Sequence, residues 1–251
     1  MDINDAWKDT CRVLLSEEVG ELGEFGPYLS KYVEKPQERI SMLSKAPIMV
    51  SSAHFGPKTR FISNDEMARY QKIARAPLNI NEVKDLDSLL GALSERFVYS
   101  GNIVVGNSSE VNQSDSCANS QFVHRSIRVF DSKFVAFSSD VRYGECIFGS
   151  DKVPASKFLI SSSNTHKSIR CMECISIMIC ADCYYSAHLE DCQNCLFSFN
   201  QKNKSYLVGN LAFARDEFAS IKAKLLADMA SLLRTKKSVL PLVDLIRDAH
   251  A

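Results

Sequence analysis

Small and aliphatic residues recur at a fixed spacing between residues 108 and 203, and no insertion interrupts the pattern. Ser, Gly or Cys stands at every sixth position from Ser108 to Ser198, and a mostly aliphatic series from Val111 to Cys195 lies halfway between them. A period of six fits neither the 3.6-residue turn of a helix nor the two-residue alternation of a strand. It fits a parallel β-solenoid, in which strands alternate with corners and each rung stacks on the last. We predict that both series point inward, into a core so thin that one column admits only small residues.

The outward positions predict a rung of twelve residues. Two places after each small residue, one series in steps of twelve begins with Phe122 and Phe134, whereas the interleaved series from Arg128 to Asn200 is polar throughout. Because the two series differ, two hexads make one rung, with one apolar and one polar side. This gives eight rungs, or nine if residues 97–107 form an irregular first rung.

An eighteen-residue, three-sided rung is the alternative, and it is the geometry of the left-handed hexapeptide helix of acyltransferases. Those proteins carry an aliphatic residue directly before a small one, whereas here the two are three positions apart. The spacing is more similar to the narrow twelve-residue solenoids of some insect antifreeze proteins, and this likeness concerns the fold alone.

The segments on either side of the repeat have helical periodicity. The predicted helices cover residues 2–21, 64–75, 81–96, 213–234 and 240–249. We therefore expect a mainly β fold with flanking α: a helical and irregular region over 1–96, the solenoid over 97–207, and helices over 208–251 that pack on it or cap it. Caps are expected because an uncovered terminal rung is a sheet edge that recruits other chains.

The apolar outer side is the first candidate for function. It exceeds the apolar patch that a monomer normally leaves in water. Either the terminal helices lie along it, or a protein partner or a second copy does, and both can share it. The residues of this candidate interaction face are Phe134, Phe137, Phe148, Phe158, Ile160, Met172, Tyr184, Tyr185, Leu196 and Phe197.

Three C-x-x-C pairs are the second candidate. They are formed by Cys171 and Cys174, Cys180 and Cys183, and Cys192 and Cys195. Zinc ribbons use this spacing, so a zinc-binding or redox module is an alternative function, and disulfides are a further possibility. However, all six cysteines fall on the inward register that Ser, Val and Ile occupy in earlier rungs. We therefore predict that they pack as small hydrophobic residues in vertical columns and that no metal or other cofactor is bound.

Composition and the absence of several motifs argue against some classes of function. Lys+Arg and Asp+Glu number 30 each, which gives no electrostatic indication of nucleic acid or an anionic membrane. The sequence has no apolar stretch of transmembrane length and no visible signal peptide, so we expect a cytoplasmic protein with reduced cysteines. It lacks a phosphate loop, a nucleophile elbow and cleft-forming loops, so we expect no enzymatic activity and no small-molecule substrate. A carbohydrate-active β-helix is the least favoured interpretation, because the solenoid lacks cleft-forming loops.

The end of the repeat supports one family resemblance. The run from Asp191 to Tyr206 contains Cys192-Gln-Asn-Cys195 and closes with Asn200-Gln-Lys-Asn-Lys-Ser-Tyr206. It resembles a group of uncharacterised Cys-rich β-solenoid proteins of tailed phages and small-genome bacteria, over residues 168–226. The resemblance implies a phage or phage-like origin. We therefore expect a non-enzymatic structural or protein-interaction protein in a large assembly, such as a virion or a ribonucleoprotein-type complex.

Overall fold

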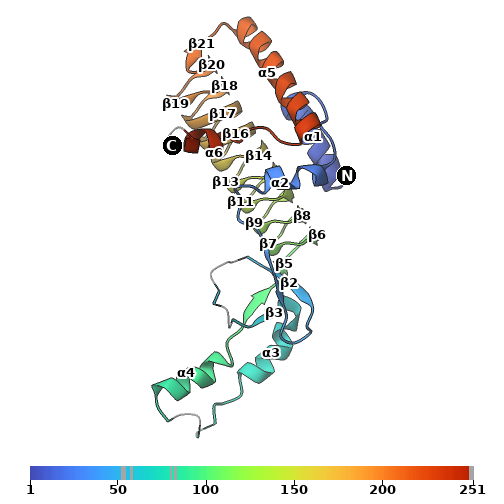
Figure 1. Cartoon of the computed structure of the whole chain (residues 1–251), viewed down its shortest axis with the longest axis vertical. Coiled ribbons are helices and arrows are strands. Elements are labelled where there is room, and N and C mark those ends of the chain that lie inside the picture. Colours follow the sequence, from blue (N-terminus) through green and yellow to red (C-terminus); the bar gives the residue numbers. More distant parts are fainter. Residues whose placement is uncertain (52–54, 57–58, 80, 82–83, 249–251) are drawn as a thin grey trace.

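The computed structural model describes residues 1–51, 55–56, 59–79, 81 and 84–248, and it contains a parallel β-solenoid with helices along one side (Figure 1). Successive rungs are offset by twelve residues: Val123 pairs with Val135, which pairs with Ile147, and Ile147 pairs with Leu159. The predicted twelve-residue rung is therefore confirmed.

Each rung contributes one strand to each of two facing parallel sheets. The covered sheet, which carries the helices, consists of β6 (Ser109–Asn112), β8 (Gln121–His124), β10 (Lys133–Ala136), β12 (Glu145–Phe148), β14 (Lys157–Ile160), the first halves of β16 (Ile169–Met178) and β17 (Ala181–Glu190), β18 (Gln193–Leu196) and β20 (Ser205–Val208). The polar sheet consists of β5 (Val104–Val105), β7 (Asp115–Ala118), β9 (Ile127–Phe130), β11 (Ser139–Arg142), β13 (Asp151–Pro154), β15 (Ser163–His166), the second halves of β16 and β17, and β19 (Phe199–Lys202).

A left-handed backbone residue between successive inward side chains produces the three-residue spacing. Every third residue from Glu110 to Gly209 has a positive φ, between +46° at Arg125 and +65° at Gly149. Such a residue reverses the pleat, so the side chain that follows it points inward again after three positions instead of two. Only Gly149 and Gly209 among these residues are glycine, although the left-handed conformation costs an L-residue roughly 1–2 kcal/mol. The stacking of rungs must therefore stabilise this backbone.

The serine columns at the two corners supply hydrogen bonds as well as small volume. The Ser126 amide donates to Ser114 Oγ at 3.0 Å, and the Ser138 amide donates to Ser126 Oγ at 3.1 Å. Each hydroxyl also donates to a carbonyl in its own rung, as Ser138 Oγ does to Ala136 at 2.8 Å. Buried backbone amides need such partners, and a corner bends the backbone away from the ordinary ladder. Serine is thus selected at these positions for chemistry as well as for size.

Helices from both termini pack side by side on the covered sheet. Helix α1 (Ile3–Leu15) crosses β8 to β16, and α5 (Arg215–Lys236) contacts α1 and β20 (Figure 1). The capping box at Asp2 starts α1, with the Asn4 and Asp5 amides donating to its carboxylate. The short helices η1 (Leu22–Phe25), α2 (Gly26–Leu29) and α6 (Leu242–Asp248) complete this layer. In these helices and the sheet beneath them lies a second core outside the solenoid.

The ends of the solenoid are closed by strands and asparagines, so of the two predicted arrangements the helices take the one in which they pack on the side of the solenoid. At the first rung, Asn102 exchanges hydrogen bonds with Met49 of β2 (Pro47–Val50), which pairs with β1 (Gln37–Ile40). At the last rung, Asn210 Oδ1 accepts from the Phe199 amide at 2.9 Å, and β21 (Leu211–Ala212) folds back antiparallel on β20. An asparagine side chain thus supplies a hydrogen-bond partner that a further rung would otherwise supply. The helices pack on the larger apolar surface along the side.

A separate arm extends beyond the first rung. It contains β3 (Phe61–Ser63) paired with β4 (Tyr99–Gly101), the helical turn η2 (Asn64–Glu66), α3 (Met67–Ala74) and α4 (Leu86–Ser94). In Figure 1, α3 and α4 lie at the opposite end of the molecule from α5. Gly101 is required where the arm meets β2, because a Cβ there would lie 2.4 Å from the Met49 carbonyl oxygen.

Candidate functional site

The predicted interaction face lies mostly beneath the chain's own helices. Eight of its ten residues are buried, Phe158 is half-buried, and Phe197 is 39% exposed. The buried ones are Phe134, Phe137, Phe148, Ile160, Met172, Tyr184, Tyr185 and Leu196. Of the two arrangements that the sequence left open, the intramolecular one therefore accounts for most of this surface, and Phe197 is the residue it leaves in solvent.

Trp7 of α1 is the centre of this packing. Its ring lies 5.0 Å from that of Phe25 and 5.3 Å from that of Phe148, and its Nε1 donates to the Gly20 carbonyl at 3.1 Å. Tyr184 Oη donates to the Leu14 carbonyl at 2.9 Å, which satisfies the last turn of the helix. The aromatic side chains thus bury their rings and keep a partner for each polar atom.

The cysteines occupy the inward columns, as predicted. Cys171, Cys183 and Cys195 are consecutive partners in the covered sheet, and Cys174 and Cys180 stand where Ser occurs in earlier rungs. All nine cysteines of the chain are buried free thiols. Cys174 Sγ lies 3.2 Å from the Cys183 carbonyl oxygen and takes over the role of a serine hydroxyl.

The pKa shifts of the thiols have two directions, because hydrogen bonds from neighbouring cysteines lower the pKa of Cys171, Cys180 and Cys195, whereas burial raises the pKa of others. Burial raises the pKa of Cys117 to about 12 and that of Cys146 to about 11, and it raises the pKa of Cys174 well above its ordinary value. Thiolates are the nucleophilic and metal-binding form of cysteine. Within the part of the chain that the structure describes, no three His, Cys, Asp or Glu side chains converge in a way that could hold a metal ion.

A buried carboxyl group joins the two terminal segments to the solenoid. Glu173 lies at a corner, where Tyr28 Oη donates to its Oε1 at 2.5 Å and the Leu242 amide donates to its Oε2 at 2.7 Å. Burial raises the pKa of Glu173 to about 7. This contact could not be predicted from the sequence, because Glu173 lies between Cys171 and Cys174, whose spacing indicates a metal site.

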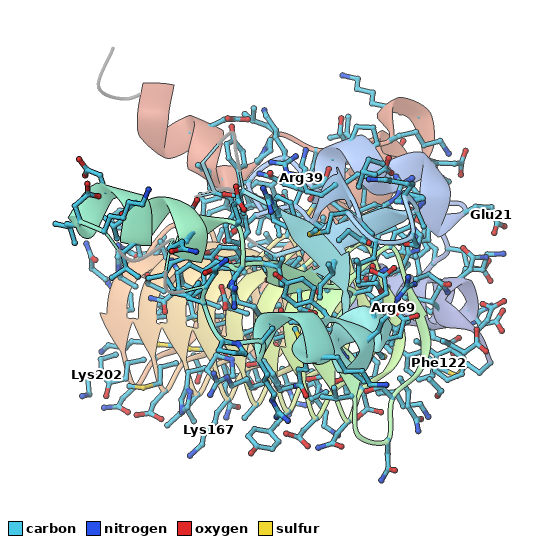
Figure 2. The ribbon with its side chains drawn as sticks, turned by 90° about the horizontal axis from the view of Figure 1, so that it is seen from below. Glu21, Arg39, Arg69, Phe122, Lys167 and Lys202 are labelled. Carbon is cyan, nitrogen blue, oxygen red and sulfur yellow. The ribbon has the colours of Figure 1, made fainter. Side chains whose placement is uncertain are left out.

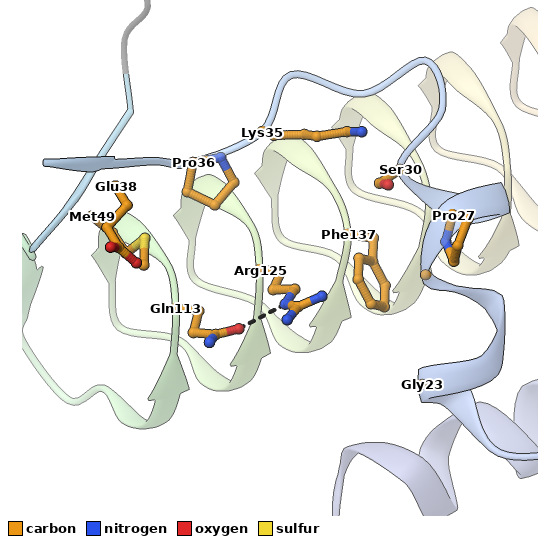
Figure 3. Close-up of a pocket in the computed structure, with 11 residues that line it drawn as sticks. Gly23, Pro27, Ser30, Lys35, Pro36, Glu38, Met49, Gln113, Arg125 and Phe137 are labelled. Atoms are coloured by element: carbon orange, nitrogen blue, oxygen red, sulfur yellow. Dashed lines mark hydrogen bonds between the residues drawn. The ribbon is translucent and has the colours of Figure 1, made fainter. Parts of the chain in front are cut away.

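An open pocket of about 470 Å³ marks the seam where the N-terminal segment crosses the solenoid (Figure 3). Gln113, Arg125 and Phe137 form one wall, and residues such as Pro27 and Lys35 form the other. Arg125 Nε donates to Gln113 Oε1 at 2.6 Å, so the two polar groups of the solenoid wall are paired with each other.

Among the described helices only α6 reaches the polar sheet, at its edge, where Val243 lies near Ser163 and Ile175, and the rest of the sheet presents charged side chains. Lys167 and Lys202 project outward from the solenoid strands (Figure 2). Opposite charges stack between rungs: Arg128 Nε lies 2.6 Å from Asp140 Oδ1, and Lys202 Nζ lies 2.7 Å from Glu190 Oε1. Such pairs match neighbouring rungs and leave this side well solvated.

Exposed apolar side chains are most concentrated on the arm. Of the nineteen large hydrophobic side chains that are exposed in the described residues, six fall between Leu86 and Val105. Leu86, Leu90, Phe97 and Tyr99 lie on the arm, and Val104 and Val105 belong to β5 of the adjoining first rung. A smaller group, Phe197, Phe199 and Leu211, lies at the last rung. Leu86 and Leu90 belong to α4, where the sequence predicts a helix over residues 81–96 but does not indicate that its apolar residues remain uncovered.

No described helix is both long enough and apolar enough to cross a membrane. No protein-family model matches the chain, and no curated protein matches it.

Proposed function

We propose that this chain is a non-enzymatic structural protein, a rigid rod that docks through its arm in a larger protein assembly. The observation that carries the proposal is the cluster of exposed apolar side chains on the arm, where Leu86 is 69% exposed and Phe97 is 67% exposed. Apolar surface of this kind marks a site of protein interaction.

Rigidity follows from the way the rungs are joined. Hydrogen bonds between rungs run through both sheets and through the serine columns, and charged side chains on the polar sheet pair across rungs. The helices add a second core along one side. A solenoid built in this way bends little, because each rung is hydrogen-bonded to its neighbours along both sheets and along the serine columns. It therefore suits a spacer that holds the arm at a fixed distance from other parts of an assembly.

The proposal is tested by sizing the tagged chain in extracts of its source by light scattering. We expect it in a complex larger than its own 28.1 kDa. Phe97→Asp should reduce the assembled fraction at least tenfold. Tyr143→Asp is the matched control, since Tyr143 is equally exposed at 67% but lies at the corner between β11 and β12, away from the arm. A chain that is monomeric in extracts, or equal losses from both variants, would contradict the proposal.

A further inference from the structure

We propose that helix α4 is a self-association element, which pairs antiparallel with α4 of a second copy of this chain. The inference rests on the proposed function and names one partner for the arm. It starts from an imbalance: α4 has a well-formed leucine stripe, yet none of its residues is buried.

The stripe lies on one face of the helix. Leu86, Leu89, Leu90 and Leu93 follow the i, i+3, i+4, i+7 spacing and cover about 100° of the helix circumference. Leu86 and Leu90 are 69% and 53% exposed, and Leu89 and Leu93 are half-buried. A helix in an aqueous monomer normally turns such a stripe to its own core, so this one is available to another molecule.

Local contacts hold α4 in shape without the stripe. Asp85 Oδ1 accepts from the Ser88 amide at 2.8 Å, and Ser88 Oγ accepts from the Asp85 amide at 3.0 Å, which is a capping box. At the other end, Arg60 Nη1 donates to the Glu95 carbonyl at 2.7 Å, and Tyr70 Oη donates to the Arg96 carbonyl at 2.6 Å. The helix is thus anchored at its C-terminal end, and its leucines are not needed for that anchorage.

The order of the leucines reads the same in both directions about a point between Leu89 and Leu90. A two-fold symmetric contact uses the same patch on both copies, so it needs a self-complementary pattern. In an antiparallel pair, Leu86 faces the partner's Leu93, and Leu89 and Leu90 lie at the two-fold axis beside their own copies. This register brings all eight leucines into contact at once.

Charge favours the antiparallel direction. The acidic residues Asp85 and Asp87 are both at the N-terminal end of α4 and both exposed. A parallel pair would set Asp85, Asp87 and Glu95 each beside its own copy. An antiparallel pair places Asp85 and Asp87 near Ser94 and Ala92 of the partner, and it sets the partner's Glu95 beside Lys84. The opposed helix dipoles also favour this direction. The acidic N-terminal end further argues against an anionic membrane as the occupant, because membrane-surface helices carry Lys and Arg on their polar face.

The contact is small, which sets the expected strength. Four leucines a side fall short of the roughly 20–30 residues a side of a standard interface. We therefore expect a weak dimer, with the dimer fraction rising with concentration between about 1 μM and about 1 mM. Within a larger assembly, several such contacts would act together.

The first test is light scattering of the purified full-length chain over that concentration range. Leu90→Asp should weaken dimerisation at least tenfold. Leu240→Asp is the control, since Leu240 is 56% exposed against 53% for Leu90 but lies outside the arm. A wild-type chain that stays monomeric throughout, or a dimer that Leu90→Asp does not affect, would overturn the inference.

The second test fixes the direction by oxidative cross-linking. Because all nine native cysteines are buried, an added exposed cysteine reacts selectively. Leu90→Cys should cross-link to its own copy, because it lies at the two-fold axis. Leu86→Cys should not, since it lies about 10 Å along the axis from its own copy at 1.5 Å per residue. Cross-linking of both variants would indicate a parallel pair and overturn the proposed direction.

The two proposals fail separately. A purified chain that remains monomeric, while Phe97→Asp still releases it from the assembly in extracts, would overturn self-pairing and leave the proposed function standing. A chain that is monomeric both when purified and in extracts would overturn both.

Discussion

Helices α1 and α4 are both short, amphipathic and started by a capping box, yet they differ completely in burial. Helix α1 buries Ala6, Trp7, Thr10, Cys11, Leu14 and Leu15 against the covered sheet, whereas α4 buries none of its residues. The hydrophobic pattern of a helix thus predicts that an apolar stripe exists but not which molecule covers it. The difference lies in the neighbours: α1 meets a broad apolar sheet, and α4 meets solvent beyond the first rung.

The largest expected effect is the loss of the α1 contact. Trp7→Ala removes a fully buried ring that packs on Phe25 and Phe148, so the free energy of unfolding should fall by about 3–5 kcal/mol. Denaturant titration measures this change. A loss below about 1 kcal/mol would mean that α1 does not form a cooperative unit with the solenoid.

The next largest effect is a pH dependence of the free energy of unfolding, caused by Glu173 where the terminal segments contact the solenoid. The pKa of Glu173 is about 7 in the folded chain, against 4.5 for the ordinary group. The folded state therefore binds the proton more tightly. Its contribution to stability is fully present below pH 4.5 and is lost as the pH rises through about 7.

One pKa unit corresponds to about 1.4 kcal/mol, so this loss amounts to about 3 kcal/mol. Glu173→Gln keeps an acceptor for the Leu242 amide and a polar partner for Tyr28, and it should remove the decline between pH 5 and pH 8. Unfolding curves at several pH values check this. If the variant declines as steeply as the wild type, another group is responsible.

The serine columns should show a medium effect. Ser138→Ala leaves the Ser150 amide without the acceptor that it has at 3.1 Å, and an unsatisfied buried donor costs about 1–3 kcal/mol. Ser138→Cys, which copies what the chain does at Cys174, should lose less. Ser176→Ala, on the outer side of the polar sheet, serves as the control and should change stability by less than about 0.5 kcal/mol. Similar losses at both serines would argue against a special role of the corner hydroxyls.

A small gain is expected at one corner. Ile179 has φ of +54° and is 50% exposed, and the left-handed region is especially unfavourable for a β-branched residue. Ile179→Asn should raise the free energy of unfolding by about 1 kcal/mol. Ile179→Val keeps the branch and should bring no gain, so equal stability of the two variants would contradict this account.

The smallest effect returns to α4. Leu90→Ala should change the stability of the monomer by less than about 0.5 kcal/mol, because Leu90 is 53% exposed within the chain. The measurement belongs at low micromolar concentration, where a weak dimer is dissociated. A loss comparable to that of Trp7→Ala would mean that α4 packs within its own chain after all.

Much of the solenoid could be predicted from the sequence, because its inward positions must repeat. The series from Val111 to Cys195 and its serine counterpart fix the inward register and place the cysteines in columns, and the outward positions predict the rung length. The left-handed residues could not be recognised in the same way. Residues as different as Phe134, Asp140 and Lys152 share that conformation, since the stacked rungs impose it and local preference does not.

The candidate site was harder to predict for two reasons. The sequence predicts an apolar outer side and amphipathic helices at both termini. Whether these helices cover the side or cap the ends depends on how much apolar surface each place offers, which the sequence does not show. The helices cover the larger apolar surface along the side. Side-chain hydrogen bonds of Asn102 and Asn210, together with the short strands beside them, close the ends. Glu173 was hidden because its role depends on Tyr28 and Leu242, which are 145 and 69 residues away.

The hydrogen bonds between residues twelve apart have a consequence for how such a chain can change in length. Duplication of the codons for one rung lengthens the solenoid by about 4.8 Å. All the remaining residues keep their inward or outward orientation. Duplication of half a rung exchanges the apolar and polar sides of everything that follows and exposes the surface on which the helices rest. The distance between the arm and the far end of the solenoid can therefore change only by whole rungs.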